Sequence, residues 1–274
     1  MSDYREIRYE VEDQIATLTF NRPEHRNPIS VDMLEEVASA VRIAQQDDGV
    51  RVLVITGAGR AFCSGGDVKS MAKVASAGGG ALSARQEQVG LIQETQLLLR
   101  RFPKVLIAAV NGAAYGAGLD LACAADFRLA ADTARFCEVY VRLGLAPGGG
   151  GAWLLPRIVG LTNALDLILS GEPIDAQTAL SIGLVSRVVP ADELPAATRE
   201  FARRFALSAP RGSPGGQADG AARARDVVRG RARFHPPADR RAATDRGPQG
   251  GLRALGSCRP PASASRDAEA RTRP

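Results

Sequence analysis

Hydrophobic and polar positions alternate near the start of the chain and then give way to a helical repeat. Residues 7–11 and 15–20 alternate apolar and polar side chains across a polar break at 12–14, which predicts a β-hairpin. A polar loop follows at 21–28. Ser30 then predicts the N-cap of a helix that ends at Asp47-Asp48-Gly49. Apolar residues recur at helical spacing in this segment: Met33, Leu34, Val37, Val41 and Ala44.

Two continuous apolar runs, 50–56 and 105–110, predict strands buried on both faces. Shorter patterns predict strands at 127–130, 135–139 and 185–189. Helices are predicted at 83–101, from about 118, from the glycines at 148–151, and at 162–169, 175–182 and 192–207. Strands and helices that alternate in this way predict an α/β fold with a largely parallel sheet.

Each continuous apolar run leads into a glycine-rich turn and then a helix start, where backbone N–H groups have no helical partner. Two such turns side by side can aim two N–H donors at one carbonyl oxygen and stabilise an oxyanion or enolate. The turns therefore indicate an enzyme. The string VLVITGAGR at 52–60 also permits a dinucleotide-binding turn, but the third glycine and a Tyr-x-x-x-Lys pair are missing.

Five segments, in order, resemble signature regions of the enoyl-CoA hydratase/isomerase family, the crotonase superfamily. They are NRPEHRNPIS from Asn21, AFCSGGDVK from Ala61, NGAAYGAGLDLACAAD from Asn111, RFCEVYVRLGLAPGGGGAWLLPRIVG from Arg135 and GEPIDAQTALSIGLVSRVV from Gly171. The resemblance covers residues 7–208. It implies a crotonase-like ββα spiral and an acyl-CoA substrate, with coenzyme A as part of the substrate and no separate cofactor.

The resemblance implies that the backbone N–H groups of Gly66 and Ala117 hold the thioester oxygen. Asp120 stands where hydratases usually have a catalytic Glu, so we expect it to be buried and to act as a base. Tyr140 stands at the position of their second catalytic Glu. Its ordinary pKa of ~10 precludes the role of a carboxylate base, although its hydroxyl can donate a hydrogen bond. Glu138 either replaces the missing acid or is a structural ion-pair partner.

The resemblance also implies contacts with coenzyme A, and basic side chains suit that anionic ligand. The implied contact residues are Arg22, Arg26, Pro28, Ser64, Asp67, Val68 and Lys69. The predicted function is that of an enoyl-CoA hydratase/isomerase acting through an enolate. Because Tyr140 departs from the hydratase pattern, isomerisation and hydration are almost equally favoured. The alternative is a non-catalytic protein of this fold that binds CoA or a protein partner.

The last part of the chain differs in composition. From Arg211 it holds 14 arginines, no lysine and 6 acidic residues, a net charge of +8 against −3 for residues 1–210. We predict a catalytic domain at 1–208 and a disordered tail at 209–274, whose composition is typical of an out-of-frame translation of GC-rich DNA. The family's C-terminal helices form trimers, often paired into hexamers. The tail lacks their apolar face, so we expect weakened assembly.

Other classes of site and location are disfavoured. Cys63, Cys123, Cys137 and Cys258 have no CxxC pairing and no histidine at metal spacing, so neither a metal site nor a disulfide framework is predicted. The basic tail lacks interleaved aromatic residues, which disfavours nucleic-acid binding. The N-terminus is charged and no apolar run approaches the ~20 residues of a membrane span, so we expect a cytoplasmic protein without membrane contact.

Overall fold

The structure is a computed structural model, in which residues 4–67 and 81–208 are described, with side chains over residues 89–207 of the second range. The chain divides into two compact units, Met1–Ala232 and Arg233–Pro274, and the second lies wholly outside the described residues. The helix start predicted after the first glycine-rich turn, at Asp67, continues into residues outside these ranges, and the tail also lies outside them. The domain boundary at 208/209 therefore stays a prediction.

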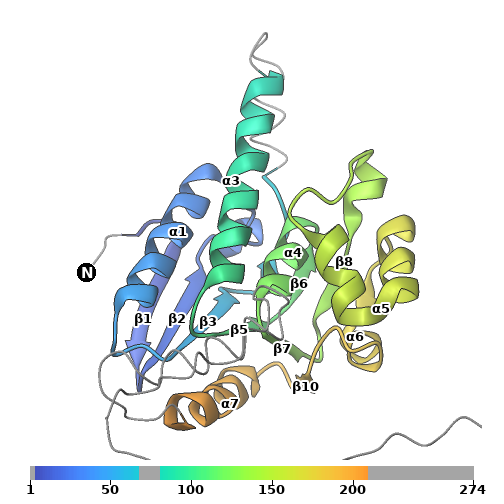
Figure 1. The fold of residues 1–274 in the computed structure, drawn as a ribbon. Helices are drawn as coiled ribbons and strands as arrows, with labels where there is room; N and C mark the ends of the chain where they lie inside the picture. The colour runs from blue at the N-terminus through green and yellow to red at the C-terminus, as the bar shows by residue number, and fades with distance from the viewer. Residues whose placement is uncertain (1–3, 68–80, 209–274) are drawn as a thin grey trace, which may run out of the picture. The chain divides into compact units, whose positions relative to one another are not determined.

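A six-stranded sheet forms the centre of the fold, in the order β1-β2-β3-β5-β7-β10. The predicted hairpin is confirmed, because the first two strands pair antiparallel. Every other neighbouring pair is parallel, as predicted. The strands are β1 (Ile7–Glu12), β2 (Ile15–Phe20), β3 (Val52–Gly57), β5 (Val105–Val110), β7 (Phe127–Ala131) and β10 (Arg187–Val189) (Figure 1).

Helices cover both faces of this sheet, and the central strands are buried on both sides as predicted. Along β3, Leu53 and Ile55 belong to the larger core, which includes residues of α1 (Val31–Gln46), α3 (Ala81–Arg101) and α4 (Ala117–Ala124). Val52 and Val54 point the other way and pack with α7 (Leu194–Ser208), which crosses the opposite face in Figure 1. The predicted cap of α1 is also confirmed, since the Ser30 side chain accepts a hydrogen bond from the Met33 N–H.

A second, four-stranded sheet of very short strands was not predicted as a sheet. Its order is β4 (Ala61–Cys63), β6 (Ala113–Tyr115), β8 (Arg135–Cys137) and β9 (Ile174–Asp175). The parallel pairing of β4 with β6 joins the two glycine turns. The remaining elements are the 3-10 helices η1 (Pro23–His25) and η2 (Val139–Leu143), and the helices α5 (Gly151–Ser170) and α6 (Ala176–Ser181).

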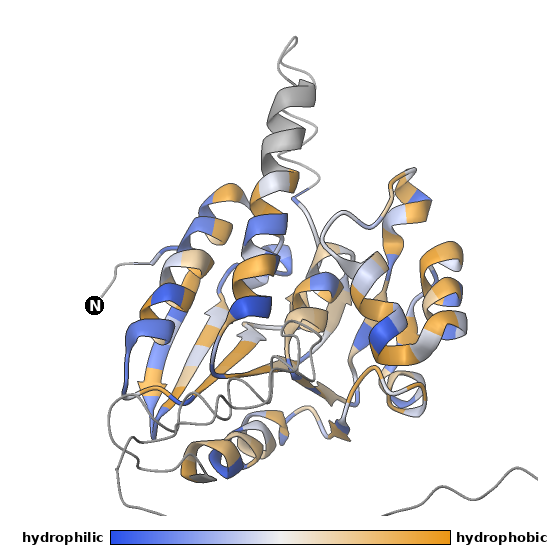
Figure 2. Ribbon diagram, viewed as in Figure 1, coloured by the Kyte–Doolittle hydropathy of each residue, from blue (hydrophilic) through white to orange (hydrophobic). Residues whose placement is uncertain are grey.

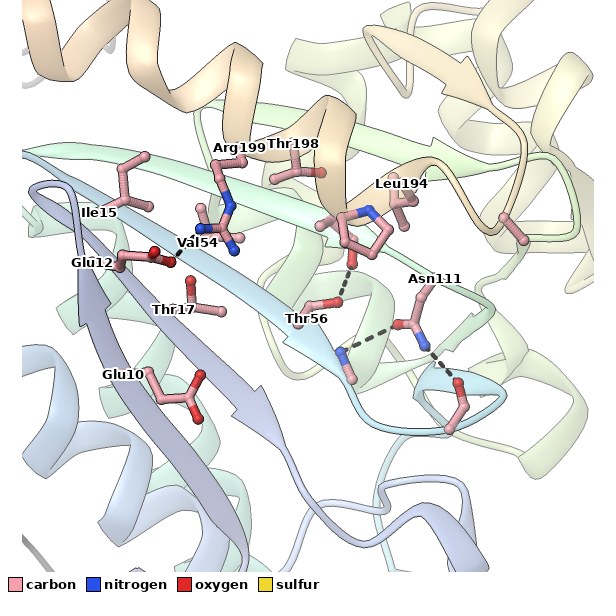
Figure 3. A pocket seen from close by; sticks show the side chains of 15 residues that line it. Glu10, Glu12, Ile15, Thr17, Val54, Thr56, Asn111, Leu194, Thr198 and Arg199 are labelled. Carbon is pink, nitrogen blue, oxygen red and sulfur yellow. Dashed lines mark hydrogen bonds and ion pairs between the residues drawn. The ribbon is translucent and has the colours of Figure 1, made fainter.

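A cavity of about 400 Å³ lies between α7 and the sheet (Figure 3). Thr17, Thr56 and Thr198 line it, together with Arg199, which forms an ion pair with Glu12. None of the predicted site residues lines this cavity. Among the helices in the described ranges, none is long and apolar enough to cross a membrane.

Candidate active site

The two glycine turns meet backbone to backbone. A Cβ atom added at Gly65, whose φ is +95°, would lie 2.9 Å from the Tyr115 carbonyl oxygen and 3.9 Å from the Ala117 nitrogen. A Cβ added at Gly118 would lie 2.4 Å from the Cys63 carbonyl oxygen. Glycine at both positions therefore permits the close approach of the two turns.

The predicted donors, Gly66 and Ala117, lie on these touching turns. Gly66 forms a parallel bridge with Ile29, in which the Ile29 N–H donates to Gly65 O at 2.8 Å and the Asp67 N–H donates to Ile29 O at 3.1 Å. The flanking groups make both bonds, so the N–H of Gly66 points away from Ile29. Ala117 is the first residue of α4, where an N–H has no acceptor within the helix.

Asp120 lies one helical turn beyond Ala117 and is completely buried, as expected from the sequence. The Tyr140 hydroxyl donates a hydrogen bond of 2.6 Å to Asp120 Oδ2. Glu138, the N-cap residue of η2, is also completely buried and lies next to Asp120, because a Cβ atom added at Gly151 would meet both Asp120 Oδ1 and Glu138 Oε1. The carboxyl oxygens of Glu138 and Asp120 Oδ1 have no hydrogen-bond donor within the described part of the chain, so a hydrogen bond between the two carboxyl groups requires a proton on one of them. The three predicted side chains thus form one cluster.

Two residues of this cluster were missed in the sequence, Gly149 and Gly151. A Cβ at Gly149 would lie 2.4 Å from Asp120 Oδ2. A Cβ at Gly151 would lie 2.2 Å from Asp120 Oδ1 and 2.8 Å from Glu138 Oε1. In the sequence, this glycine run predicts only the start of a helix. The available signal was that a glycine-rich helix N-terminus suits an anion, and here that anion is the Asp120 carboxylate.

The cluster is electrostatically unusual because burial opposes charge on all three side chains. Burial raises the pKa of Asp120 to about 6, although the hydrogen bond from Tyr140, and the nearby Glu138 carboxyl and backbone at Gly149 and Gly151, favour its ionised form. Burial, and then the charge of Asp120, raise the pKa of Glu138 to about 9. The same two causes raise the pKa of the Tyr140 hydroxyl. Both pKa values are therefore raised, which favours one shared proton on the pair, and the hydrogen bond from Tyr140 favours the charge on Asp120.

The residues implied to contact coenzyme A lie in different surroundings. Arg22 forms ion pairs with Glu6 and Asp67. Arg26 is exposed, Pro28 is buried, and the backbone N–H of Ser64 donates to Arg26 O at 3.0 Å. Val68 and Lys69 lie outside the described residues. The CoA-binding roles stay predictions. Over residues 4–67 and 81–208, no three His, Cys, Asp or Glu side chains form a cluster that could hold a metal ion.

The fold and this cluster define an enzyme of the α/β class with a crotonase-like fold, and comparisons with known proteins agree. The family model for enoyl-CoA hydratase/isomerase matches residues 10–213. The chain belongs to the enoyl-CoA hydratase/isomerase family. This membership favours the catalytic interpretation over a non-catalytic protein of the same fold.

Relatives of both kinds match similar parts of the chain. The trans-2-decenoyl-(acyl-carrier-protein) isomerase of Streptococcus mutans is 38% identical over an aligned region that covers 70% of this chain and 72% of the isomerase. The crotonyl-CoA hydratase of Syntrophomonas wolfei is 39% identical over a region that covers 74% of this chain and 76% of the hydratase. A crystal structure of enoyl-CoA hydratase from Bacillus anthracis has 31% identity and a TM-score of 0.74, with 82% of this chain and 83% of that chain covered. Hydratases and isomerases are therefore both represented among the relatives.

Proposed function

We propose that this enzyme forms the enolate of an acyl-CoA thioester and that its main reaction is migration of the double bond of an enoyl-CoA. The observation that carries this proposal is that the completely buried Asp120 and Glu138 carboxyl groups lie next to each other beside Gly151. One of them is poised to accept a proton while the other holds one. A neighbouring acid and base of this kind suit a reaction in which a proton leaves one carbon and returns to another.

The proposed reaction has two proton transfers. The ionised Asp120 removes a proton from C2 of a 3-enoyl-CoA, and the electron pair moves to the thioester oxygen to form a dienolate. The N–H groups of Gly66 and Ala117 stabilise that oxygen, and each such donor typically contributes about 2.7–4 kcal/mol. Delivery of a proton to C4 from the Asp120–Glu138 pair then gives the 2-enoyl-CoA. The reaction uses no cofactor besides the CoA moiety of the substrate.

Hydration is the second candidate. It requires a water molecule held by two acidic groups, and Glu138 supplies a second acid that the Tyr140 position lacks. However, Glu138 lies next to Asp120 and both carboxyl groups are completely buried, an arrangement that favours exchange of a proton over placement of a water. We therefore rank isomerisation first.

Two substrates and one exchange measurement test the ranking. We expect 3-hexenoyl-CoA to be converted to the 2-enoyl product faster than crotonyl-CoA is hydrated. In D₂O, we also expect deuterium at C2 of a saturated acyl-CoA, because enolate formation precedes either reaction. Faster hydration of crotonyl-CoA would reverse the ranking. A folded enzyme that transforms neither substrate and exchanges no deuterium would contradict the whole proposal.

We further propose that copies of this cytoplasmic enzyme associate with one another, less tightly than the trimers of its family. The supporting observation is on α5, much of which is hydrophobic in Figure 2. Three of its apolar side chains, Leu161, Leu165 and Leu169, are 64%, 46% and 67% exposed. An exposed apolar surface of this kind is typical of an interaction site. Sedimentation of the full chain should show a reversible, concentration-dependent oligomer, and a stable hexamer would contradict this expectation.

A further inference from the structure

An ion-pair network contacts the first glycine turn through Asp67. Arg22 Nε lies 3.3 Å from Glu6 Oε1, and Arg22 Nη1 lies 3.4 Å from Asp67 Oδ2. The same Nη1 donates to the Pro28 carbonyl oxygen at 3.3 Å. The Arg22, Glu6 and Asp67 side chains are only 20%, 19% and 12% exposed. One guanidinium therefore connects the segment before β1, the loop at 21–30 and the turn that carries Gly66.

The partners of Arg22 are themselves fixed. The Ser30 hydroxyl donates a hydrogen bond to Glu6 Oε2, and Ser30 also caps α1. Asp67 directly follows Gly66, and its backbone N–H bonds to Ile29 on the same loop. The backbone bridge at Ile29 and the ion pair at Asp67 thus hold the turn on either side of the Gly66 amide.

The charge around Arg22 argues against contact with a phosphate group. One cation is paired with two carboxylates, so the local charge sums to −1 when all three groups are ionised. A coenzyme A phosphate approaching this group would be repelled by two carboxylates, and a direct contact would compete with ion pairs that already exist. The resemblance to the family implies a CoA contact for Arg22, but its surroundings suit a different task.

We propose that Arg22 is a positioning residue, which acts through Asp67 to hold the Gly66 N–H in the orientation that stabilises the enolate oxygen. This inference rests on the proposed function of Gly66 as a donor. Loss of the ion pair would let the turn shift, and a misplacement of ~1 Å can cost about 10²-fold in rate. The loss would fall on kcat, because a donor that is misaligned with the developing charge weakens the transition state more than substrate binding.

The experiment compares two thioesters of the same acyl group. One is the CoA thioester and the other the N-acetylcysteamine thioester, which keeps the reacting carbonyl but has no phosphate. For Arg22→Gln we expect kcat to fall about 10- to 100-fold with both substrates and KM to change little. Asp67→Asn should show the same signature, and the double variant should lose no more than Arg22→Gln alone, because both changes break one ion pair. Arg8→Gln, an exposed arginine on β1, is the matched control.

The outcomes separate the two ideas. A rise in KM for the CoA thioester alone, with normal kinetics on the N-acetylcysteamine thioester, would show a phosphate contact and overturn the inference. A double variant whose loss of kcat equals the combined losses of the two single variants would also overturn it, because the two residues would then act independently. If Arg22→Gln does not fold, Arg22→Lys and Asp67→Asn carry the same comparison. An unchanged kcat in the variants would overturn the inference about Arg22 alone. If the unmodified enzyme transforms neither thioester, the proposed function itself fails.

Discussion

Two clusters of carboxyl groups flank the oxyanion donors proposed above, and they differ in one respect, the presence of a cation. Glu6 and Asp67 share the guanidinium of Arg22. Asp120 and Glu138 are completely buried, and over the described ranges neither forms an ion pair. Carboxylates beside a cation remain charged and fix geometry, whereas buried carboxyl groups without one exchange protons near neutral pH. The same residue type therefore has different roles in the two clusters.

The largest effect should come from removing the proton acceptor of the cation-free cluster. Asparagine in Asp120→Asn keeps the shape of the side chain but accepts no proton, so we expect kcat to fall about 10²- to 10⁴-fold in the isomerisation assay. Thermal unfolding should show that the variant remains folded. Asp132→Asn, an exposed residue after β7, should retain full activity. An Asp120→Asn enzyme with more than a tenth of the original rate would remove Asp120 from the mechanism.

A smaller loss should follow from crowding the same cluster without changing its charge. In Gly151→Ala the new methyl group would overlap Asp120 Oδ1 at 2.2 Å and displace both carboxyl groups. We expect about a 10²-fold loss of kcat, because the reacting groups move while the backbone of α5 persists. Gly90→Ala is the matched control, since its added Cβ meets nothing within 4 Å and alanine stabilises a helix by about 1 kcal/mol. Equal activities of the two variants would contradict the placement of Gly151.

The smallest effect concerns the pH at which the cluster works. Asp120 acts as a base only when ionised, so kcat should fall as the pH drops through about 6, the raised pKa of this carboxyl. The Tyr140 hydroxyl bonds to the ionised form, and its removal in Tyr140→Phe should raise that pKa further. A hydrogen bond to a charged group contributes about 1.5–3 kcal/mol. The acidic limb of the plot of kcat against pH should therefore move upward by about 1–2 pH units. A limb that moves downward would contradict the proposed hydrogen bond.

Local patterns in the sequence predicted the local elements well. The hairpin and the Ser30 cap depend on neighbouring residues, and both are confirmed. The helix expected from residue 162 corresponds to the second half of α5, because Gly160 interrupts the element with φ 78° and ψ 163°. In the second sheet, the strand predicted at 135–139 corresponds to β8, which ends at Cys137. The other strands of this sheet were not predicted, because two or three residues are too few for a hydrophobic period to develop.

The candidate site was predicted in part, for a related reason. Family resemblance placed Asp120, Glu138 and Tyr140, and the structure gathers them, although Glu138 and Tyr140 lie at the start of a 3-10 helix rather than on an extended strand. The contact of Gly151 with Asp120 joins residues 31 positions apart, and no local pattern encodes such a contact. The pairing of Arg22 with Glu6 and Asp67 could not be predicted from the sequence for the same reason. It depends on how the loop at 21–30 packs against the first glycine turn.

The parallel pairing of β4 with β6 also affects how the enzyme acquires activity. Ala61 pairs with Ala113 and Cys63 with Ala114, so roughly fifty residues of chain must be placed before the two glycine turns can meet. Contacts of such long sequence separation form slowly during folding, because the loop between them must close first. A folding intermediate that contains the hairpin and isolated helices would have no donor pair. Recovery of turnover during refolding should therefore lag behind recovery of helical circular dichroism.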